Sequence, residues 1–496
     1  MAKRFCNLIN GERIKEGSQG TFKNINPADR SDVIGIFPKS GKAEVNAAVR
    51  AAKKAFESWR LVPAPKRGEI LKRAGDLLVK YKEQLAELET REMGKILDET
   101  RGDVQEGIDT AYYMAGEGRR MFGDTVPCEL PNKSGFSIRQ PVGVCGMITP
   151  WNFPLAIPTW KVFPALVCGN TVVIKPATDT PATVVRFGEI LEEAGLPAGC
   201  YNVVCGSGGQ VGVPLCEHPD VRAVSFTGST SVGSQIAEIC GRLNKKVSLE
   251  MGGKNAQIVM DDADLDLALQ GALWGAFGTS GQRCTATSRL ILHKKIAAKF
   301  TRMLVRAAKS LRVGNGLNPK TQMGPVINKT AQADILEYIR IGQEEDGADL
   351  ILGGKPLRRG RYARGSFIEP TIFNNVTPKM RIFWEEIFGP VLSVSVVSSF
   401  DQAIKYINQS HFGLSSSIYT KDVNRAFQAI RDIEAGITYI NGPTIGAEIQ
   451  LPFGGVKGTG NGHRESSHTV LDMFSEWKSV YVDFSGKLQR AQIDTE

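Results

Sequence analysis

This chain of 496 residues lacks several patterns that mark common classes of functional site. Its nine cysteines contain no C-x-x-C pair, and its five histidines contain no pair at the i, i+4 spacing of zinc ligands on one helix face. The G-x-S-x-G turn that carries the nucleophile of many hydrolases is also missing. We therefore expect neither a metal site nor a serine hydrolase.

A strong excess of one charge is missing as well. The 61 Lys and Arg residues exceed the 52 Asp and Glu residues by a formal +9, which is modest for this length, and the two signs are interspersed. Such a surface lacks the clustered basic stripe of a nucleic-acid-binding protein, so we expect no nucleic-acid partner. A mildly positive surface does suit an anionic cofactor or an acidic substrate.

Long apolar segments are absent too. The longest uncharged stretch, residues 142–160, is interrupted by Pro150, Pro154 and Pro158, which argues against a membrane-spanning helix. The N-terminus has no apolar core of a signal peptide. Because scattered cysteines are typical of a reducing compartment, we expect a cytoplasmic protein without a membrane partner.

The remaining pattern is that of a large folded α/β protein. Hydrophobic residues make up 42% of the chain, and its length exceeds one ordinary core, so we expect two or more domains. Strand-like runs alternate with helix-length segments, which predicts parallel strands in an open sheet whose ligands bind beyond the carboxyl ends of the strands. The expected strands are 142–149, 171–175, 202–205 and 223–227, and the expected helices include 160–168 and 180–194.

The N-terminal part follows a different pattern. Residues 4–40 favour short strands and turns, whereas residues 43–121 follow helical periodicity. Within the helical part, Asp103, Glu106 and Asp109 lie at helical spacing. Acids in this arrangement lie far more often on a solvated helix face than around a metal ion, so we expect them to face solvent.

One thiol, Cys284, lies in an unusual setting. The residues before it are small, and Gly278 and Gly281 allow backbone conformations closed to other residues. Helical periodicity precedes this segment and a strand-like run, 289–293, follows it, so Cys284 lies on a turn that can present its side chain to a cleft. A lone cysteine is more often buried and inert, and Arg283 favours a thiolate only if its guanidinium turns inward.

A carboxylate and an amide lie in similarly constrained segments. Glu250 ends an apolar run just before a Gly-Gly turn, and Asn152 lies between Pro150 and Pro154. Each alone is more often a surface acid or a turn amide. Together, thiol, carboxylate and amide supply the nucleophile, the base and the oxyanion donor that acyl chemistry requires.

These three segments, in this order and spacing, resemble the aldehyde dehydrogenases, which oxidise aldehydes to acids with NAD or NADP. The resemblance extends from about residue 22 to residue 484. It implies that Cys284 is the nucleophile, that Asn152 holds the oxyanion, and that Glu250 activates the hydrolytic water. It also implies that Lys161 relays a proton near the thiol.

The resemblance further implies a cofactor site. G-x-G-x-x-G is absent, but residues 228–233 match the family's G-S-T-x-x-G turn, whose helix amides can bind a pyrophosphate. NAD-preferring members often carry Glu at the place of Thr178. A carboxylate there would repel a 2′-phosphate and Thr178 would not, so we expect NADP to be accepted alongside NAD. The residues expected to bind the cofactor are Thr149, Pro150, Trp151, Lys175, Thr178, Gly208, Gly228, Ser229, Gly233, Glu386 and Phe388.

The resemblance implies three parts: a Rossmann-type cofactor-binding domain, an α/β catalytic domain and a small β oligomerisation arm. The expected parts are 1–122, 142–252 and the returning segment 452–471 for the cofactor domain, 253–451 for the catalytic domain, and 123–141 with 472–490 for the arm. In the family such arms extend a neighbour's sheet, so we expect a homo-oligomer, either a dimer or a tetramer. An ordinary edge hairpin within one chain is the alternative.

The substrate is a small-molecule aldehyde, and two residues are expected to contact it. Arg283 can pair with a carboxylate or phosphate on the aldehyde or support its own turn, and Phe453 lies in the family's P-F-G-G loop. The loop at 441–448 and the tail at 474–478 resemble those of members that act on semialdehydes of carboxylic acids. A generic aldehyde dehydrogenase, a CoA-acylating relative and a non-catalytic relative remain as alternatives; Glu250 favours hydrolysis over transfer to CoA.

Overall fold

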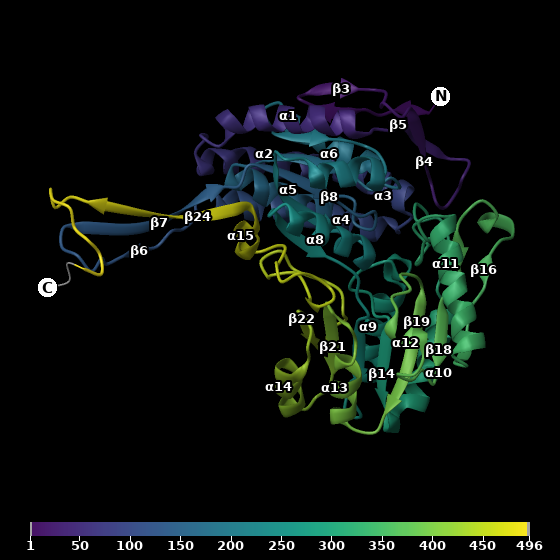
Figure 1. Cartoon of the computed structure of the whole chain (residues 1–496). Coiled ribbons are helices and arrows are strands. Elements are labelled where there is room, and N and C mark those ends of the chain that lie inside the picture. Colours follow the sequence, from purple (N-terminus) through teal and green to yellow (C-terminus); the bar gives the residue numbers. More distant parts are fainter. Residues whose placement is uncertain (1, 494–496) are drawn as a thin grey trace.

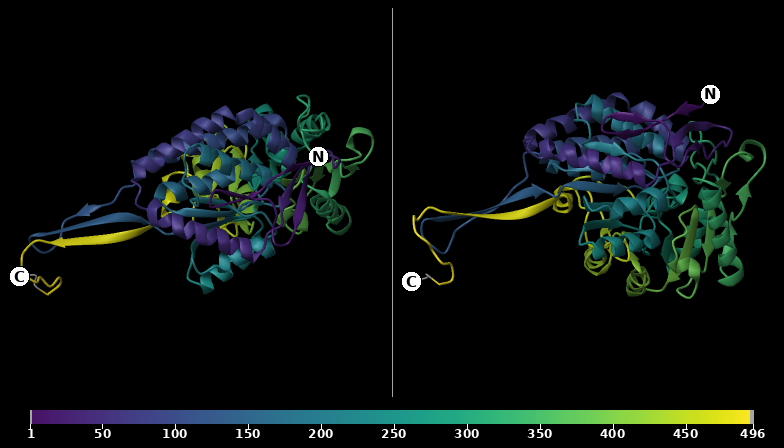
Figure 2. Two further views of the ribbon diagram at one scale, coloured as in Figure 1. Left: turned by 90° about the horizontal axis from the view of Figure 1, so that it is seen from above. Right: turned by 45° about the horizontal axis from the view of Figure 1, so that its top comes forward.

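The computed structural model describes residues 2–493, and two seven-stranded sheets form the centres of its two large bodies. Figure 1 shows one body above the other, with a narrow arm that projects to the side. Figure 2 shows the same arm extending away from the bodies in two further views. This is the α/β architecture with a β arm that the sequence predicts. Among residues 2–493, no helix is long and apolar enough to cross a membrane.

Five parallel strands form the centre of the first sheet. Their order is β12-β11-β8-β9-β10, and β2 and β3 continue the sheet beyond β10 as antiparallel strands. All four strands expected in this region are present, with ends that shift by a few residues. The strands are β2 (Asn7–Ile9), β3 (Glu12–Ile14), β8 (Val144–Ile148), β9 (Thr171–Lys175), β10 (Tyr201–Val203), β11 (Val221–Thr227) and β12 (Lys246–Glu250).

Helices cover both faces of this sheet because its strands are apolar on both sides. In β8, Cys145 and Met147 pack among α2 to α6, whereas Val144 and Ile148 pack among α1, α7 and α8. Alternate residues of a strand point to opposite faces, so one buried strand serves two cores. The helices are α1 (Lys42–Trp59), α2 (Ala64–Lys80), α3 (Lys82–Met93), α4 (Leu97–Glu117), α5 (Ala156–Cys168), α6 (Pro181–Glu193), α7 (Val213–Glu217) and α8 (Thr230–Arg242).

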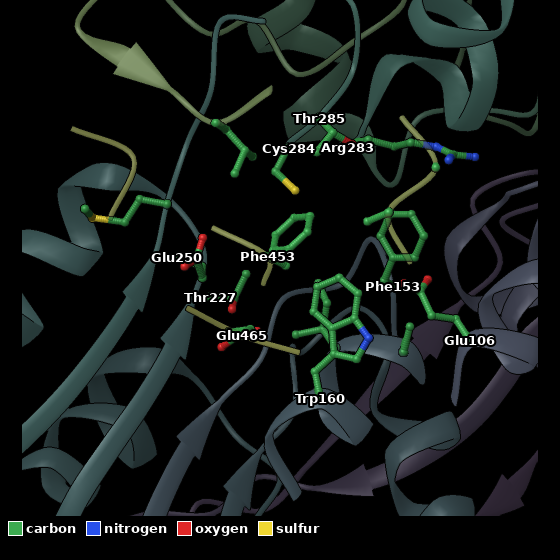
Figure 3. Close-up of a pocket in the computed structure, with 16 residues that line it drawn as sticks. Glu106, Phe153, Trp160, Thr227, Glu250, Arg283, Cys284, Thr285, Phe453 and Glu465 are labelled. Atoms are coloured by element: carbon green, nitrogen blue, oxygen red, sulfur yellow. The ribbon is translucent and has the colours of Figure 1, made fainter. Parts of the chain in front are cut away.

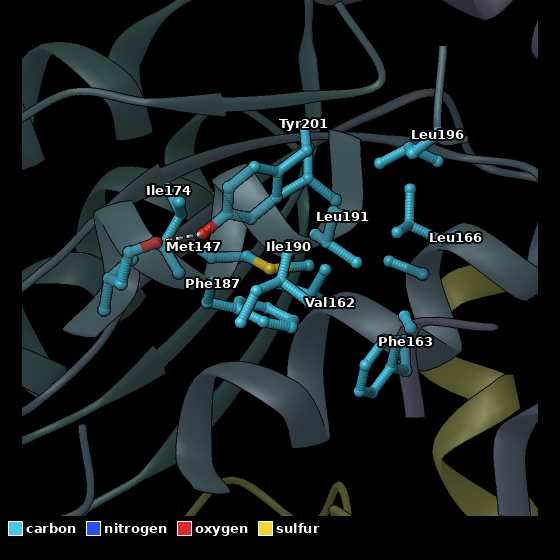
Figure 4. Close-up of a cluster of buried hydrophobic side chains, with 14 of the residues drawn as sticks. Met147, Val162, Phe163, Leu166, Ile174, Phe187, Ile190, Leu191, Leu196 and Tyr201 are labelled. Carbon is cyan, nitrogen blue, oxygen red and sulfur yellow. Dashed lines mark hydrogen bonds between the residues drawn. The ribbon is translucent and has the colours of Figure 1, made fainter. Parts of the chain in front are cut away.

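The core beneath α5 and α6 contains large aromatic side chains (Figure 4). The Phe187 ring lies edge-on to Phe163 and to Tyr201, with centroids 5.4 and 5.7 Å away. The Tyr201 hydroxyl donates to the Val184 carbonyl oxygen at 3.2 Å, which satisfies the one polar atom that this packing buries. Each fully buried side chain of this size contributes about 1.5–3 kcal/mol, so this cluster holds the helices against the sheet.

The parallel register brings the carboxyl ends of four strands to one edge. Ile148 pairs with Lys175 on one side and with Phe226 on the other, and Thr227 pairs with Glu250. Ligands of open parallel sheets bind beyond this edge. The loops that leave the four strand ends therefore start close to one another.

The second sheet has the order β15-β18-β19-β14-β13-β21-β22, and all its strands are parallel except β15. Its strands are β13 (Ala256–Val259), β14 (Arg289–His293), β15 (Asp349–Leu352), β18 (Thr371–Asn374), β19 (Val391–Val397), β21 (Ser415–Tyr419) and β22 (Ile437–Ile440). Its helices are α9 (Leu265–Phe277), α10 (Lys294–Lys309), α11 (Lys329–Arg340), α12 (Arg381–Trp384), α13 (Phe400–Asn408) and α14 (Val423–Asp432). The helix expected before Cys284 is α9, and the strand expected after it is β14.

The arm is a three-stranded antiparallel sheet made from two distant segments. Strand β24 (Ser475–Asp483) pairs with β7 (Lys133–Pro141) over nine residues, and β6 (Thr125–Val126) lies on the other side of β7. Large apolar side chains of the arm are exposed, among them Trp477, Tyr481 and Val482. A sheet this small has no core of its own in one chain.

Shorter elements complete the chain. A three-stranded sheet near the N-terminus has the order β1-β5-β4, and two small pairs join β16 to β17 and β20 to β23. These elements are β1 (Lys3–Arg4), β4 (Thr21–Ile25), β5 (Val33–Pro38), β16 (Pro356–Leu357), β17 (Phe367–Ile368), β20 (Phe412–Gly413), β23 (Val456–Lys457) and α15 (Leu471–Phe474).

The expectation that three acids of α4 face solvent is wrong for two of them. Asp103 is buried, Glu106 is half-buried, and only Asp109 is exposed. Residues three apart in an α-helix are offset by about 60° around the axis, so three such residues turn progressively from the core toward solvent. Asp103 is stabilised in the core because it accepts hydrogen bonds from the Lys95 ammonium at 2.7 Å and from the Ala156 backbone N–H at 2.7 Å.

The buried Lys95–Asp103 pair gives a test of this packing. Their side chains are 1% and 0% exposed, so Lys95→Met leaves the Asp103 carboxylate without its counter-charge in the core. We expect the free energy of unfolding to fall by about 3–5 kcal/mol, the usual cost of breaking a buried pair on one side. Thermal unfolding measures the change as a lower midpoint temperature.

The matched control is Lys72→Met, which removes a pair with Asp76 whose side chains are 63% and 49% exposed. Surface pairs of this kind contribute about 0–1 kcal/mol, so this variant should unfold close to the unchanged protein. Equal midpoints for the two variants would contradict the stabilising role of Lys95.

Candidate active site

Cys284 lies between two cavities at the junction of the two bodies. The first cavity is lined by Cys284, Glu250 and a group of aromatic and aliphatic side chains (Figure 3). The second is lined by Cys284, by loops at the carboxyl ends of β8 and β11, and by the segment that includes Glu386. A reactant in one cavity and a cofactor in the other would therefore meet at the Cys284 sulfur.

The turn that presents Cys284 depends on small residues. After α9 the chain forms a short turn in which Thr279 and Ser280 have φ values of 53° and 55°, followed by Gly281 at 69°. A Cβ on Gly281 would lie 2.1 Å from the Gly389 carbonyl oxygen, so only glycine fits there. The Asn255 side chain donates to the Cys284 carbonyl oxygen at 2.7 Å and holds the end of the turn.

The Cys284 thiol is protonated in this environment. Burial, and then the charges of Glu250 and Glu386, raise its pKa to about 12, although the backbone N–H groups of Thr285 and Cys284 act in the opposite direction. A thiol with this pKa is a weak nucleophile until a base removes its proton. The nearby acid that can act as this base is Glu250.

Glu250 is the last residue of β12, and its side chain points into the first cavity (Figure 3). Neither carboxyl oxygen has a hydrogen-bond partner among the described residues. Burial and then the neighbouring Glu465 raise the pKa of Glu250 well above its ordinary value, while Lys161 and Arg464 act in the opposite direction. A buried acid with a raised pKa and free oxygens can take a proton near neutral pH.

Glu465 is a residue of this cavity that the sequence analysis did not identify. Its carboxylate is buried, lines the same cavity as Glu250, and accepts hydrogen bonds from the Lys161 ammonium and the Ser225 hydroxyl. Lys161 itself is completely buried in α5 and does not line the cavity. Its ammonium donates to Glu465, so Lys161 contacts the cavity through that carboxylate.

Asn152 lies at the boundary of the second cavity, close to the Cys284 turn. Its side-chain amide donates one hydrogen bond to the Gln282 carbonyl oxygen at 3.1 Å, which fixes the amide two residues before the thiol. An amide nitrogen carries two N–H groups, so a second donor remains for a reacting oxygen. The structure thus brings Cys284, Glu250 and Asn152 together.

The second cavity collects most of the residues expected to bind the nicotinamide end of a cofactor. Trp151 lies edge-on to Phe388, with centroids 5.4 Å apart, and the two rings share one wall. Glu386 accepts from the Gly253 backbone N–H at 2.9 Å, and burial raises its pKa to about 7, opposed by the Gly253 bond and by Lys254. The cavity residues that the sequence analysis had assigned to the cofactor are Pro150, Trp151, Gly228, Ser229, Glu386 and Phe388.

Three observations fit a dinucleotide in this cavity. The buried hydroxyls of Thr149 and Thr227 have no hydrogen-bond partner among the described residues, and Thr227 lines the cavity. A Cβ on Gly252 would lie 2.4 Å from Glu386 Oε2, so a side chain at this position would displace the Glu386 carboxylate. Ser229 is the N-cap of α8, whose first N–H groups are free to bind an anion.

The other expected cofactor residues lie outside this cavity. Lys175 ends β9, and its buried ammonium donates to the Pro176 carbonyl oxygen at 2.6 Å; burial lowers its pKa to about 8. Thr178 is exposed in the following loop, with its hydroxyl 3.5 Å from the Gly206 carbonyl oxygen.

Two of the expected cofactor residues are glycines of other segments. Gly208 begins the short helix 208–212, and a Cβ there would meet nothing within 4 Å. Gly233 lies in α8, where a Cβ would strike Met251.

Arg283 and Phe453 both line the first cavity. The Phe453 ring packs on Trp160, with centroids 4.7 Å apart, and forms an apolar wall. The Arg283 guanidinium donates to the Glu99 carboxylate at 3.1 Å and to the Thr279 hydroxyl at 2.8 Å. Arg283 therefore supports its own turn, as one of the two interpretations of the sequence proposed, and its Nη1 still has no partner among the described residues.

Three of the cavity residues have no signal in the sequence. Glu465 follows His and Arg in an ordinary polar segment, Glu106 was expected to face solvent, and Thr227 lies at the end of a predicted strand. Only the fold brings these residues to one cavity. No cluster of three potential metal ligands occurs in the part of the chain that the structure describes.

Nearly the whole chain is similar to proteins of known family. The aldehyde dehydrogenase family model matches residues 14–480. The α-ketoglutaric semialdehyde dehydrogenase of Bacillus subtilis is 44% identical over 478 residues, which cover 96% of this chain and 98% of the relative. The 2,5-dioxopentanoate dehydrogenase of Saccharolobus solfataricus is 41% identical over 94% of this chain and 97% of the relative.

A solved structure has the same fold. The crystal structure of a putative aldehyde dehydrogenase from Burkholderia cenocepacia superposes with a TM-score of 0.95 at 37% identity and covers 99% of each chain. The family model, the relatives and the fold all span nearly the full length. The chain therefore belongs to the aldehyde dehydrogenase family, whose members oxidise an aldehyde to an acid with NAD or NADP.

Proposed function

We propose that this enzyme oxidises aldehydes that carry a carboxylate at their far end, the semialdehydes, to the corresponding dicarboxylic acids. The observation that carries the proposal is the position of Arg283, which lines the cavity of Cys284 and has an Nη1 group without a protein partner in the described chain. A guanidinium is well matched to a carboxylate. The two relatives reported above are named for semialdehydes or dioxo acids, which supports the same class.

Cys284 begins the reaction in this proposal. Its sulfur, once deprotonated, attacks the aldehyde carbon and forms a thiohemiacetal. The negative oxygen is held by the Asn152 amide and the Cys284 backbone N–H; one such donor is worth about 3 kcal/mol. NAD or NADP, when bound, supplies the oxidant, and Glu386, Phe388 and Trp151 would hold it against the Cys284 side of the cavity.

Glu250 completes the reaction. Oxidation leaves a thioester on Cys284, and Glu250 takes a proton from water so that the water can release the acid product. The free oxygens of Glu250 and its raised pKa suit this task. Glu465 and Lys161 lie behind Glu250 and provide hydrogen-bonded groups through which the proton can leave.

The two bodies would divide these tasks. We propose that the first body, residues 1–122 and 142–252 with the returning segment 452–471, binds the cofactor, and that residues 253–451 carry the nucleophile. The scattered cysteines support the cytoplasm as the compartment. Glu250 argues against a CoA-acylating enzyme, because a base that activates water favours hydrolysis of the thioester. The presence of the nucleophile, the base and the oxyanion donor together argues against a non-catalytic relative.

A generic aldehyde dehydrogenase is the second candidate, because the cavity wall is largely aromatic and aliphatic. Phe153, Trp160, Leu414 and Phe453 would accept an uncharged chain. A panel of aliphatic, aromatic and ω-carboxylate aldehydes, tested separately with NAD and NADP, distinguishes the candidates. The semialdehyde proposal requires the highest kcat/KM with ω-carboxylate aldehydes.

The roles of Cys284 and Glu250 can be separated kinetically. Cys284→Ala should abolish turnover while NAD still binds, since no nucleophile remains. Glu250→Gln should give a slow burst of reduced cofactor and then stall, because the Cys284 thiol has lost its base and the thioester that forms is not hydrolysed. Stopped-flow absorbance measures both. A Glu250→Gln variant with the full steady-state rate would contradict the assigned base.

The cofactor preference depends on Thr178 in this proposal. Thr178→Glu should lower kcat/KM for NADP by at least about tenfold and change it little for NAD, because a carboxylate near the ribose repels a 2′-phosphate. Thr178→Gln, which adds length without charge, is the control. Equal losses with the two cofactors would place Thr178 away from the 2′-phosphate.

The exposed arm supports a homo-oligomer. Tyr481 is 69% exposed on a sheet without a core, and burial against a second copy would remove this apolar surface from water. Tyr481→Asp should therefore shift the mass measured by light scattering toward a single chain. Leu61→Asp, at an equally exposed site on the first body, should leave the mass unchanged. An unchanged mass for Tyr481→Asp would count against the arm as the contact.

A further inference from the structure

Glu106 is the acid of the substrate cavity that the proposed chemistry does not use. It lies on α4, at the end of the cavity away from Glu250, and Phe153 separates it from Cys284 in Figure 3. Glu106 and Arg283 also both line the neighbouring outer cavity. The two side chains therefore meet any group that occupies the far end of the substrate.

The Glu106 carboxyl has no hydrogen-bond partner among residues 2–493, although it is half-buried. The other acids around it are satisfied. Asp103 is bonded to Lys95 and to the Ala156 N–H, and Glu99 accepts from Arg283 and from the Thr279 N–H. Glu106 alone has both oxygens available for a ligand.

A carboxylate at this place would work against an anionic substrate. Glu99 already balances the charge of Arg283, so an ionised Glu106 would make the far end of the cavity net negative. An uncharged Glu106 has the opposite effect, because its O–H can donate a charge-assisted hydrogen bond to the carboxylate of the aldehyde. The same side chain therefore either admits or repels a semialdehyde, depending on one proton.

We propose that Glu106 acts as an uncharged acid that donates a hydrogen bond to the distal carboxylate of the aldehyde, while Arg283 Nη1 donates to the same carboxylate. Glu106 is thereby a specificity-determining residue for anionic aldehydes. This inference rests on the proposed semialdehyde function and adds a residue to it.

The surroundings of Glu106 favour the protonated form. Burial raises its pKa to about 8, the negative charges of Asp103 and Asp109 on the same helix act in the same direction, and the cations Lys95 and Arg283 oppose them. Asp98 and Glu99, also on α4, line the outer cavity together with Glu106. The charge of Glu106 in turn contributes to the raised pKa of Tyr439 on β22. Because the pKa is raised, the donor is present near neutral pH and is lost as pH rises through about 8.

The test compares two aldehydes that differ in charge alone. Succinate semialdehyde carries the distal carboxylate, and methyl 4-oxobutanoate carries its uncharged methyl ester. The ratio of their kcat/KM values, measured from about pH 6 to about pH 9.5 at saturating cofactor, cancels the shared pH dependence of the chemical steps. We expect the ratio to favour the semialdehyde below pH 8 and to fall roughly tenfold above it, as expected when a hydrogen bond to a charged group is lost.

Two variants separate the proton from the shape of the side chain. Glu106→Gln keeps an N–H donor at every pH, so its ratio should stay high and no longer change with pH. Asp109→Asn removes an exposed negative charge that helps to raise the pKa of Glu106, so in this variant the fall of the ratio should persist and move toward lower pH. If Glu106→Gln does not fold, the profile of the unchanged enzyme decides alone.

The outcomes are distinct. A ratio that favours the semialdehyde but does not change with pH, or a falling ratio that persists in Glu106→Gln, overturns the role of Glu106 and leaves the semialdehyde function standing. A ratio near one at every pH overturns the semialdehyde function and this inference with it. Activity with neither aldehyde but with longer ω-carboxylate aldehydes moves the same comparison to those acids and their methyl esters.

Discussion

The site depends on one constraint, the parallel register that ends β8, β9, β11 and β12 at the same edge of the first sheet. Paired residues such as Thr227 and Glu250 must lie side by side. Lys175 is the last residue of β9, and the loops that follow β8 and β11 carry Asn152 and Gly228. The second body then needs to contribute little more than the Cys284 turn and the Glu386 segment. The two bodies thus contact each other at the carboxyl ends of these strands, where Cys284, Glu250 and Asn152 lie.

Burial gives these residues their chemistry. The interior that surrounds Cys284 and Glu250 raises the pKa of both groups, so the thiol holds its proton until a base takes it and the Glu250 carboxylate has an increased affinity for a proton. Other charges buried in this interior are paired. Lys161 with Glu465, and Lys95 with Asp103, place compensated ions directly behind the cavity walls. Lys95 also lies over the Phe153 ring at 3.6 Å, so this pair supports a wall of the substrate cavity.

The two ends of the substrate cavity are organised in a similar way. Near Cys284, Glu250 is an acid without a hydrogen-bond partner beside a paired one, Glu465; at the far end, Glu106 is unpaired beside the paired Glu99 and Asp103. An acid that is already bonded holds the structure, whereas an acid with free oxygens can exchange a proton with a ligand. In the proposed mechanism, the unpaired acid at each end of the cavity exchanges a proton with the substrate or with water.

The amino-acid sequence by itself determined the fold class and the strands and helices around Cys284, and it identified the residues proposed as nucleophile, base and oxyanion donor, because each of these depends on local periodicity or on a contiguous motif. The tertiary structure alone decided which acids are buried. Asp103, Glu106 and Asp109 follow one spacing but face the core, the cavity and solvent, and Lys161 contacts the site only through Glu465, which lies 304 residues further along the chain. Burial and pairing depend on which distant segments pack together, and no local pattern contains that information.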